Sequence, residues 1–183
     1  MKKIKFEKFT IKDIVFLAVI TAVTLLASGP VAPLVMTVTK LGTQAFAMAL
    51  PFSIFTSVGL RKVKKAGSLT IIGLFSGLFL LLMAPVMFFN QFVATLLSEG
   101  LALMLFKTYK DKITVLFSSG LFSFFTIPTT VAVNILLKDS SLSQQIGNPI
   151  TFVLLVLGTT VLGFLGATIG NKIADELQKA GKL

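Results

Sequence analysis

The sequence predicts an all-α integral membrane protein, a single bundle of six transmembrane helices with both termini in the cytoplasm. Three observations support this fold class. Of the 183 residues, 55% are hydrophobic and only 13% are charged, whereas a soluble domain carries about 25% charged residues. The apolar residues gather into six segments of membrane-spanning length. The basic residues gather in alternate connections, as they do in multi-pass membrane proteins.

The apolar segments follow one another closely and leave no room for a separate soluble domain. The third and fourth segments touch at Ala84, Pro85 and Val86. A continuous helix from residue 67 to residue 106 would be about 60 Å long, twice the thickness of the bilayer core. We therefore expect a tight reversal at Pro85, which lacks a backbone donor. The expected helices span about residues 11–28, 42–60, 67–84, 86–106, 113–137 and 149–174.

The basic residues predict the orientation, because lysine and arginine accumulate in cytoplasmic connections. Fifteen of the 17 basic residues lie near the N-terminus, in the second and fourth connections or near the C-terminus; Lys40 and Lys138 lie on the other side. The chain is thus expected in the cell membrane with both ends inside. A cleaved signal peptide ending near Ala27 is an alternative for the first segment, although its apolar run is longer than is typical.

Two external connections are long for so compact a chain. Residues 28–41 contain Pro30 and Pro33, and residues 138–148 are rich in serine and glutamine. These stretches are either simple connectors or a lid over an outward-opening cavity.

Polar residues inside the predicted spans indicate a binding site. Glu99 is the one ionisable residue deep within a span, and Thr95 and Gln91 precede it at intervals of four on the same helix face. The fifth span repeats this spacing with Thr126, Thr130 and Asn134. If the two stripes face each other, they form a pocket with neutral hydrogen-bonding groups near the outer surface. The candidate substrate-binding residues are Gln44, Asn90, Gln91, Thr95, Glu99, Thr130, Asn134 and Asn148.

A structural role is the alternative for these residues. Threonine and asparagine in membrane helices often bond to their own backbone or to a neighbouring helix, and Glu99 fits a structural or proton-sharing role equally well. Small residues recur at intervals of four in several spans, where they allow close helix approach, mostly within the same chain. These pairs are Ala18 and Ala22, Ala45 and Ala49, Gly73 and Gly77, and Gly166 and Gly170.

The whole chain resembles the substrate-binding S component of an energy-coupling factor (ECF) vitamin transporter. The resemblance rests on six short helices, basic cytoplasmic termini, a proline-containing loop after the first helix and the Ala-x-x-x-Ala pattern at Ala18 and Ala22. It implies a subunit that captures a micronutrient from outside. It also implies that Ala18 and Ala22 dock onto a membrane coupling subunit, which two cytoplasmic ATPases drive.

The resemblance does not identify the ligand. The chain has no tryptophan, and its one tyrosine, Tyr109, lies at the predicted cytoplasmic side, unlike in thiamine-type sites that stack the ligand on large aromatic side chains. A hydroxymethylpyrimidine or a pyridoxine-like vitamin suits neutral amides and phenylalanines better. The chain contains no phosphate-binding loop, so we expect the partner subunits to bind and hydrolyse the ATP that drives transport.

Other function classes fit the sequence less well. Histidine and cysteine are absent, so we expect no thiolate nucleophile, no enzyme activity and no metal or other cofactor. The positive charge lies between apolar runs, which argues against nucleic acid as a partner. The main alternative is a stand-alone secondary transporter or channel in which Glu99 carries a coupling proton. A purely structural membrane subunit is the third possibility.

Overall fold

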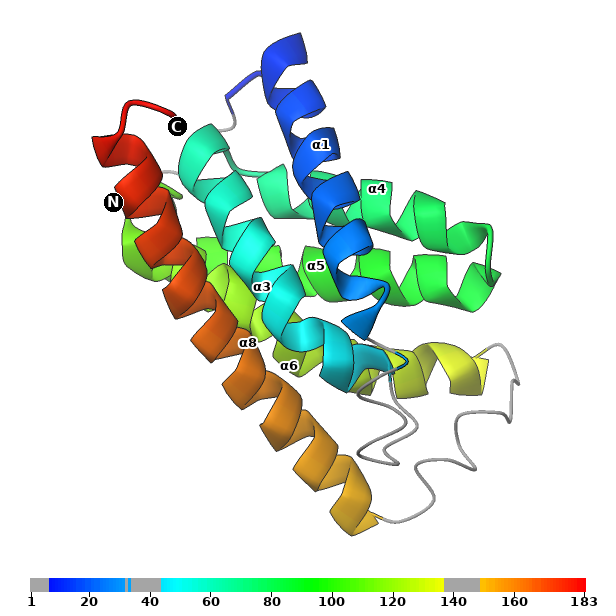
Figure 1. Cartoon of the computed structure of the whole chain (residues 1–183). Coiled ribbons are helices and arrows are strands. Elements are labelled where there is room, and N and C mark those ends of the chain that lie inside the picture. The colour runs from blue at the N-terminus through cyan, green and yellow to red at the C-terminus, as the bar shows by residue number, and fades with distance from the viewer. Residues whose placement is uncertain (1–6, 32, 34–43, 137–148) are drawn as a thin grey trace.

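A computed structural model describes residues 7–31, 33, 44–136 and 149–183, and the regular elements in these ranges are α-helices that form one bundle (Figure 1). Each helix overlaps one of the predicted segments, so the all-α fold class is confirmed. The helices are α1 (Ile11–Ser28), α3 (Gln44–Val63), α4 (Ser68–Leu81), α5 (Pro85–Phe106), α6 (Lys112–Leu136) and α8 (Pro149–Lys179).

Local sequence signals fix the helix ends. Thr10 caps α1: its hydroxyl accepts a hydrogen bond from the backbone N–H of Asp13, and the Asp13 carboxylate accepts one from the backbone N–H of Thr10. Pro85 is the first residue of α5, where its missing N–H costs no helical hydrogen bond. The chain turns between Leu82 and Ala84, which confirms the reversal predicted at Pro85.

Five of the six described helices are long and apolar enough to cross a bilayer. The exception is α4, whose 14 residues extend about 21 Å, less than the ~30 Å of a typical hydrocarbon core. The predicted third span, residues 67–84, is therefore wrong in length, because Gly67 caps the start of α4 and the chain already turns at Leu82. The chain is a multi-pass membrane protein in which α4 packs against α1 and α5.

The distribution of side chains is reversed relative to a soluble protein. Serines and threonines fill much of the interior, and Ser57 of α3 donates a hydrogen bond to the hydroxyl of Ser119 in α6 at 3.0 Å. Ser53 donates to the backbone oxygen of the same residue at 3.2 Å. Large apolar side chains such as Leu26 and Met104 point outward. A bilayer provides the apolar surroundings that such a surface needs.

Small residues bring the helices close together. A Cβ atom at Gly166 would lie 2.5 Å from the backbone oxygen of Leu50 in α3, and one at Gly170 would collide with the same helix one turn later. Gly73 of α4 allows Thr95 of α5 to occupy the space where its own side chain would stand. The two glycine pairs of the sequence are therefore used for packing within the chain.

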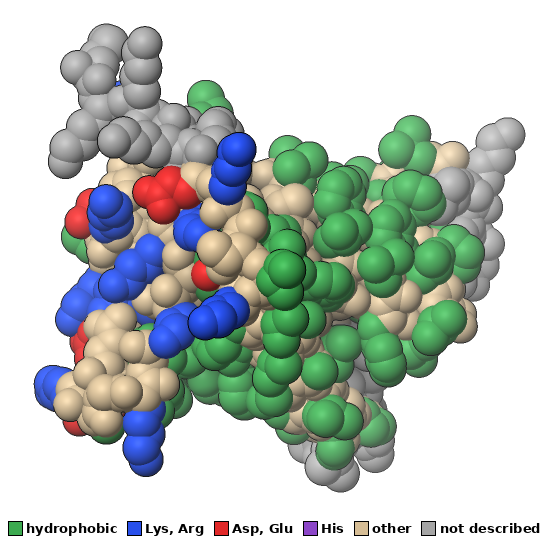
Figure 2. All heavy atoms as spheres, turned by 90° about the horizontal axis from the view of Figure 1, so that it is seen from above, with side chains coloured by type: hydrophobic (Ala, Val, Ile, Leu, Met, Phe, Trp, Pro, Cys, Tyr) green, Lys and Arg blue, Asp and Glu red, His purple; other side chains and the backbone are tan. Residues whose placement is uncertain are grey.

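The charged residues gather at one end of the bundle. The start of α1 and the ends of α3 and α8 lie at this end (Figure 1). Seen from above, basic and acidic side chains cover one side of the molecule, and hydrophobic side chains cover much of the remainder (Figure 2). We call this region the basic end and the opposite region the outer end, following the predicted orientation.

Candidate functional site

The outer halves of α5 and α6 are joined by a direct polar contact. The hydroxyl of Thr129 donates a hydrogen bond to Oδ1 of Asn90 at 2.5 Å. Asn90 is a predicted site residue, whereas Thr129 was missed because the prediction followed the interval of four from Thr126 to Thr130. The signal was available in the sequence, since Thr129 lies three residues after Thr126 and so shares much of its helix face.

Two buried amide side chains lie on the same two helices, Gln91 next to Asn90 in α5 and Asn134 five residues after Thr129 in α6. Gln91 is 8% exposed, and its side chain makes no hydrogen bond with the residues that the structure describes. Asn134 is 3% exposed; its Nδ2 donates to the backbone oxygen of Thr130 at 2.7 Å, while its Oδ1 has no partner among the described residues. Both side chains therefore retain hydrogen-bonding capacity in an interior from which water is largely excluded.

The predicted threonines bond to their own helices. The hydroxyl of Thr95 donates to the backbone oxygens of Gln91 at 3.0 Å and Phe92 at 2.9 Å, and its side chain lies against Gly73. The hydroxyl of Thr130 donates to the backbone oxygen of Thr126 at 2.6 Å. These contacts agree with a structural role for the threonines, because each hydroxyl donates its hydrogen bond to the backbone of the preceding helical turn.

Glu99 lies in a different environment, at the start of α4. Its carboxylate accepts hydrogen bonds from the backbone N–H groups of Gly67 at 2.8 Å, Leu69 at 3.4 Å and Thr70 at 2.8 Å. The Thr70 hydroxyl adds a fourth bond at 2.5 Å. The first N–H groups of a helix lack partners within the helix and carry partial positive charge. Glu99 therefore caps α4 and joins this helix to α5.

This position separates Glu99 from the amides of the outer end. Eight residues divide it from Gln91 along α5, which corresponds to about 12 Å. The stripe of Gln91, Thr95 and Glu99 is buried along its whole length, but Thr95 and Glu99 contact α4. The structure thus brings Asn90 together with α6 and places Glu99 at the basic end.

Two further predicted residues lie where their side chains are not described. Gln44 begins α3, but its side chain lies outside the described residues, and Asn148 lies outside them entirely. The two long external connections, residues 28–41 and 138–148, also fall largely or wholly outside the described ranges. Their expected role as a lid stays a prediction.

Tyr109 extends the polar cluster around Glu99. It lies between α5 and α6, is fully buried, and its hydroxyl oxygen accepts a hydrogen bond from Ser118 at 2.9 Å. Burial raises the pKa of Tyr109 well above its usual value, and the negative charge of Glu99 raises it further. Sequence reasoning placed Tyr109 at the cytoplasmic side but did not identify this contact, which joins residues distant in the sequence.

The ionisation of Tyr109 gives a direct test of this environment. Since the folded-state pKa lies above the unfolded value of about 10, the stability contributed by the protonated phenol is fully present below pH 10 and is lost as the pH rises further. The chain has one tyrosine and no tryptophan, so ultraviolet difference absorbance reports this group alone. We expect phenolate absorbance to appear only with unfolding; titration near pH 10 in the folded protein would contradict this environment.

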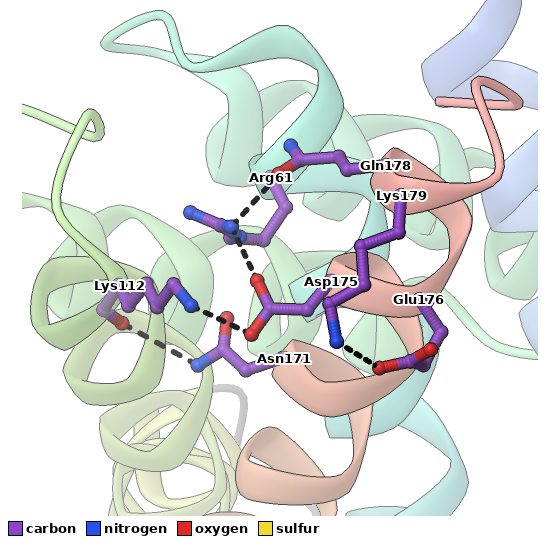
Figure 3. A network of polar contacts seen from close by, with 7 residues as sticks. All are labelled: Arg61, Lys112, Asn171, Asp175, Glu176, Gln178 and Lys179. Atoms are coloured by element: carbon purple, nitrogen blue, oxygen red, sulfur yellow. Dashed lines mark hydrogen bonds and ion pairs between the residues drawn. The ribbon is translucent and has the colours of Figure 1, made fainter.

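Ion pairs tie several helices together at the basic end. Arg61 of α3 donates to the Asp175 carboxylate of α8 at 2.7 Å, and Lys112 of α6 donates to its other oxygen at 2.6 Å (Figure 3). Lys65, in the turn after α3, pairs with Asp13 of α1 at 2.6 Å. Arg61 is 4% exposed, which reduces the screening of its pair by water.

The predicted docking alanines lie on α1. Ala22 is exposed and Ala18 is half-buried, and exposed apolar residues surround them on the same helix, including Val15, Val19 and Leu26. The buried face of α1 instead carries Leu17, Thr21, Thr24 and Ser28. Unlike the glycine pairs of α4 and α8, this alanine pair therefore leaves an apolar surface available to lipid or to another helix.

The outer end of α5 and α6 carries amide donors and acceptors, which are groups that can form hydrogen bonds with a ligand. Within the described ranges, no three acidic, histidine or cysteine side chains are grouped so that they could hold a metal ion. Comparisons with protein-family models, with curated proteins and with solved structures find no match to this chain.

Proposed function

We propose that this chain is the substrate-capture (S) subunit of an ECF-type importer, which binds a small vitamin or vitamin precursor at the outer face of the membrane. The observation that carries the proposal is the buried Oδ1 of Asn134, which has no partner among the described residues, together with the buried side chain of Gln91 on the helix that carries the Asn90–Thr129 contact. A buried polar group without a partner costs about 1–3 kcal/mol. A ligand that supplies these partners recovers this free energy when it binds.

The side chains around these amides favour a neutral, planar ligand. Asparagine and glutamine each present both donors and an acceptor, and they carry no charge. Phe88 and Phe92 lie on the same part of α5 with their rings parallel and their centroids 6.0 Å apart. An aromatic ring that carries hydroxyl or amine groups matches both features, as a hydroxymethylpyrimidine or a pyridoxine-like vitamin does.

Import of a bound ligand needs an energy source, which the resemblance assigns to partner subunits. A membrane coupling subunit would contact Ala18 and Ala22, and two cytoplasmic ATPases would drive the complex. The exposure of Ala22 and the apolar residues around it support this assignment, because small residues allow close packing of membrane helices.

The environment of Glu99 argues against the alternative of a stand-alone proton-coupled transporter. A carboxylate that carries a coupling proton must exchange it with water during transport. Glu99 is 3% exposed and accepts four hydrogen bonds that hold the start of α4. Protonation would weaken these bonds, since they are strongest with the charged carboxylate.

Paired substitutions test capture and docking separately. Gln91→Ala and Asn134→Ala are each expected to weaken ligand binding by about tenfold and to leave complex assembly intact. Ala18→Leu and Ala22→Leu should leave binding intact and disrupt assembly, because a larger side chain prevents close helix contact. The ligand is first identified by mass spectrometry of small molecules released from the purified protein, and its binding is then measured by isothermal titration calorimetry.

Two results would count against this assignment. Unchanged affinity in both amide variants would remove the proposed site from the outer end of α5 and α6. Normal assembly and uptake in both alanine variants would show that this face of α1 is not used for docking.

A further inference from the structure

Two turns at the basic end pack against each other. One connects α3 to α4 and the other connects α5 to α6. Both rest on a single cluster of buried side chains, in which Ala66 and Tyr109 from the turns meet residues of the adjoining helices. The other members of the cluster are Leu60, Leu69, Leu103 and Val115. The remaining residues of 61–67 and 107–112 lie over this shared cluster, and we call these two stretches together the two-turn surface.

Both α3 and α5 are followed directly by a lysine with a left-handed backbone. Lys64 has φ 53° and Lys107 has φ 64°, and within the described ranges they are the two non-glycine residues with positive φ. The N–H of Lys64 donates to the backbone oxygen of Leu60 at 3.0 Å, and that of Lys107 donates to Leu103 at 2.9 Å. Glycine is the usual residue at such a helix end, because any Cβ atom is disfavoured there. Lysine is thus a costly choice for the fold at both positions.

The lysines of the two-turn surface greatly outnumber its acids. Residues 61–67 and 107–112 contain seven basic residues and one acid, Asp111. Arg61, Lys65 and Lys112 are used in ion pairs with other elements. Glu99, the nearest buried acid, is already bound to the start of α4. The remaining lysines make no ion pair with the residues that the structure describes; they are Lys62, Lys64, Lys107 and Lys110.

Strongly apolar surface lies directly beside these lysines. Met104 and Leu105 are 72% and 64% exposed in the last turn of α5, three and two residues before Lys107. Ile113 is 59% exposed at the start of α6, immediately after Lys112. The lysines therefore stand where the lipid-facing surface ends, at the depth of phospholipid headgroups.

From this combination we propose that the two-turn surface binds the headgroups of anionic phospholipids, with Lys64 and Lys107 as its central contacts. The phosphate lies against the unpaired ammonium groups, and the acyl chains cover Met104, Leu105 and Ile113. The adjoining apolar side chains favour a lipid over an acidic protein, because they belong to membrane-spanning helices and acyl chains cover them in the bilayer. This surface serves the resting protein in the membrane and does not depend on the transport role.

The double variant Lys64→Gly/Lys107→Gly separates lipid binding from folding, because glycine suits both backbone conformations. The probe is phosphatidylglycerol, compared with phosphatidylcholine, added to the full chain in mild detergent; bound lipids are counted by native mass spectrometry and unfolding midpoints are measured by heating. We expect the variant to melt no lower than the wild type in phosphatidylcholine. Its affinity for phosphatidylglycerol should fall by about fivefold for each lysine removed.

Two controls locate the effect. Lys64→Arg/Lys107→Arg keeps both charges and should keep the preference for phosphatidylglycerol. Lys172→Gln/Lys182→Gln removes two exposed charges from the end of α8 and its tail and should also keep it. If the glycine variant does not fold, Lys62→Gln/Lys110→Gln removes two charges from the same surface at positions without positive φ.

Several outcomes would overturn the proposal. Equal binding of both lipids by the wild type would be one such outcome. Equal loss of the preference in the glycine and α8 variants would be another, because it indicates diffuse surface charge. If glycerol phosphate, which has no acyl chains, stabilised the protein as strongly as the lipid, the surface would be a site for free phosphate. Unchanged lipid preference in the glycine variant, with loss only of partner assembly, would assign the surface to an acidic protein.

Discussion

Replacement of Glu99 with alanine is expected to lower the free energy of unfolding by about 3–5 kcal/mol, because it removes a buried charge from fixed partners. Three backbone N–H groups at the start of α4 and the Thr70 hydroxyl lose their acceptor at once. The stability of Glu99→Gln should lie between that of the wild type and that of Glu99→Ala, since an amide retains one oxygen acceptor and loses the charge. Denaturant unfolding in detergent micelles, followed by circular dichroism, measures both changes.

The matched control is Glu176→Ala. Glu176 is an exposed carboxylate that pairs with Lys179 on the surface of α8, so its removal should leave the unfolding midpoint unchanged. Wild-type stability in Glu99→Ala would contradict the capping role. A stable Glu99→Gln variant that loses proton-driven uptake by the chain alone would instead support the stand-alone transporter.

Substitution of Gly170 by alanine is expected to destabilise the bundle by about 1–3 kcal/mol through overpacking. The added Cβ atom would collide with the backbone oxygen of Ile54 and lie 2.8 Å from the Cβ of Ser57. A flexible side chain could move aside, but the α3 backbone cannot do so without shifting the whole helix. The unfolding midpoint under the same conditions as for Glu99 measures this cost.

Gly100 provides the corresponding control on α5. An added Cβ atom there meets nothing within 4 Å, and the position lies within a regular helix. Gly100→Ala should therefore raise stability by about 0.5–1 kcal/mol, the ordinary preference of a helix for alanine. Equal effects of the two substitutions would show that α8 and α3 are not in close backbone contact.

The helix pattern and the reversal at Pro85 were predictable because they depend on local features. The length of an apolar run indicates how much of the chain lies in the membrane. Pro85, the first residue of α5, can be read from the sequence as a helix start. The length of α4 was not predictable in the same way. Leu82 and Met83, near the end of the predicted span 67–84, are as apolar as a helix interior but form the turn, and their exposure is acceptable only in lipid.

The candidate site was predictable in part. Residue spacing identified the buried face of α5 from Gln91 to Glu99, because helix periodicity decides which side chains share a face. It could not show that Glu99 reaches the start of α4, since that contact depends on how two antiparallel helices meet. The same limit applies to Thr129, whose bond to Asn90 depends on the register between α5 and α6.

We propose that this chain captures its ligand at the outer end and depends on partner subunits for transport. Native mass spectrometry of the chain, purified in mild detergent from the membranes in which it is made with its own partners, tests this claim most directly. We predict one complex that contains the chain, a membrane coupling subunit, two ATPase subunits and a bound small molecule. Recovery of the chain without any ATPase, in a form that alone imports its ligand into liposomes, would contradict the claim.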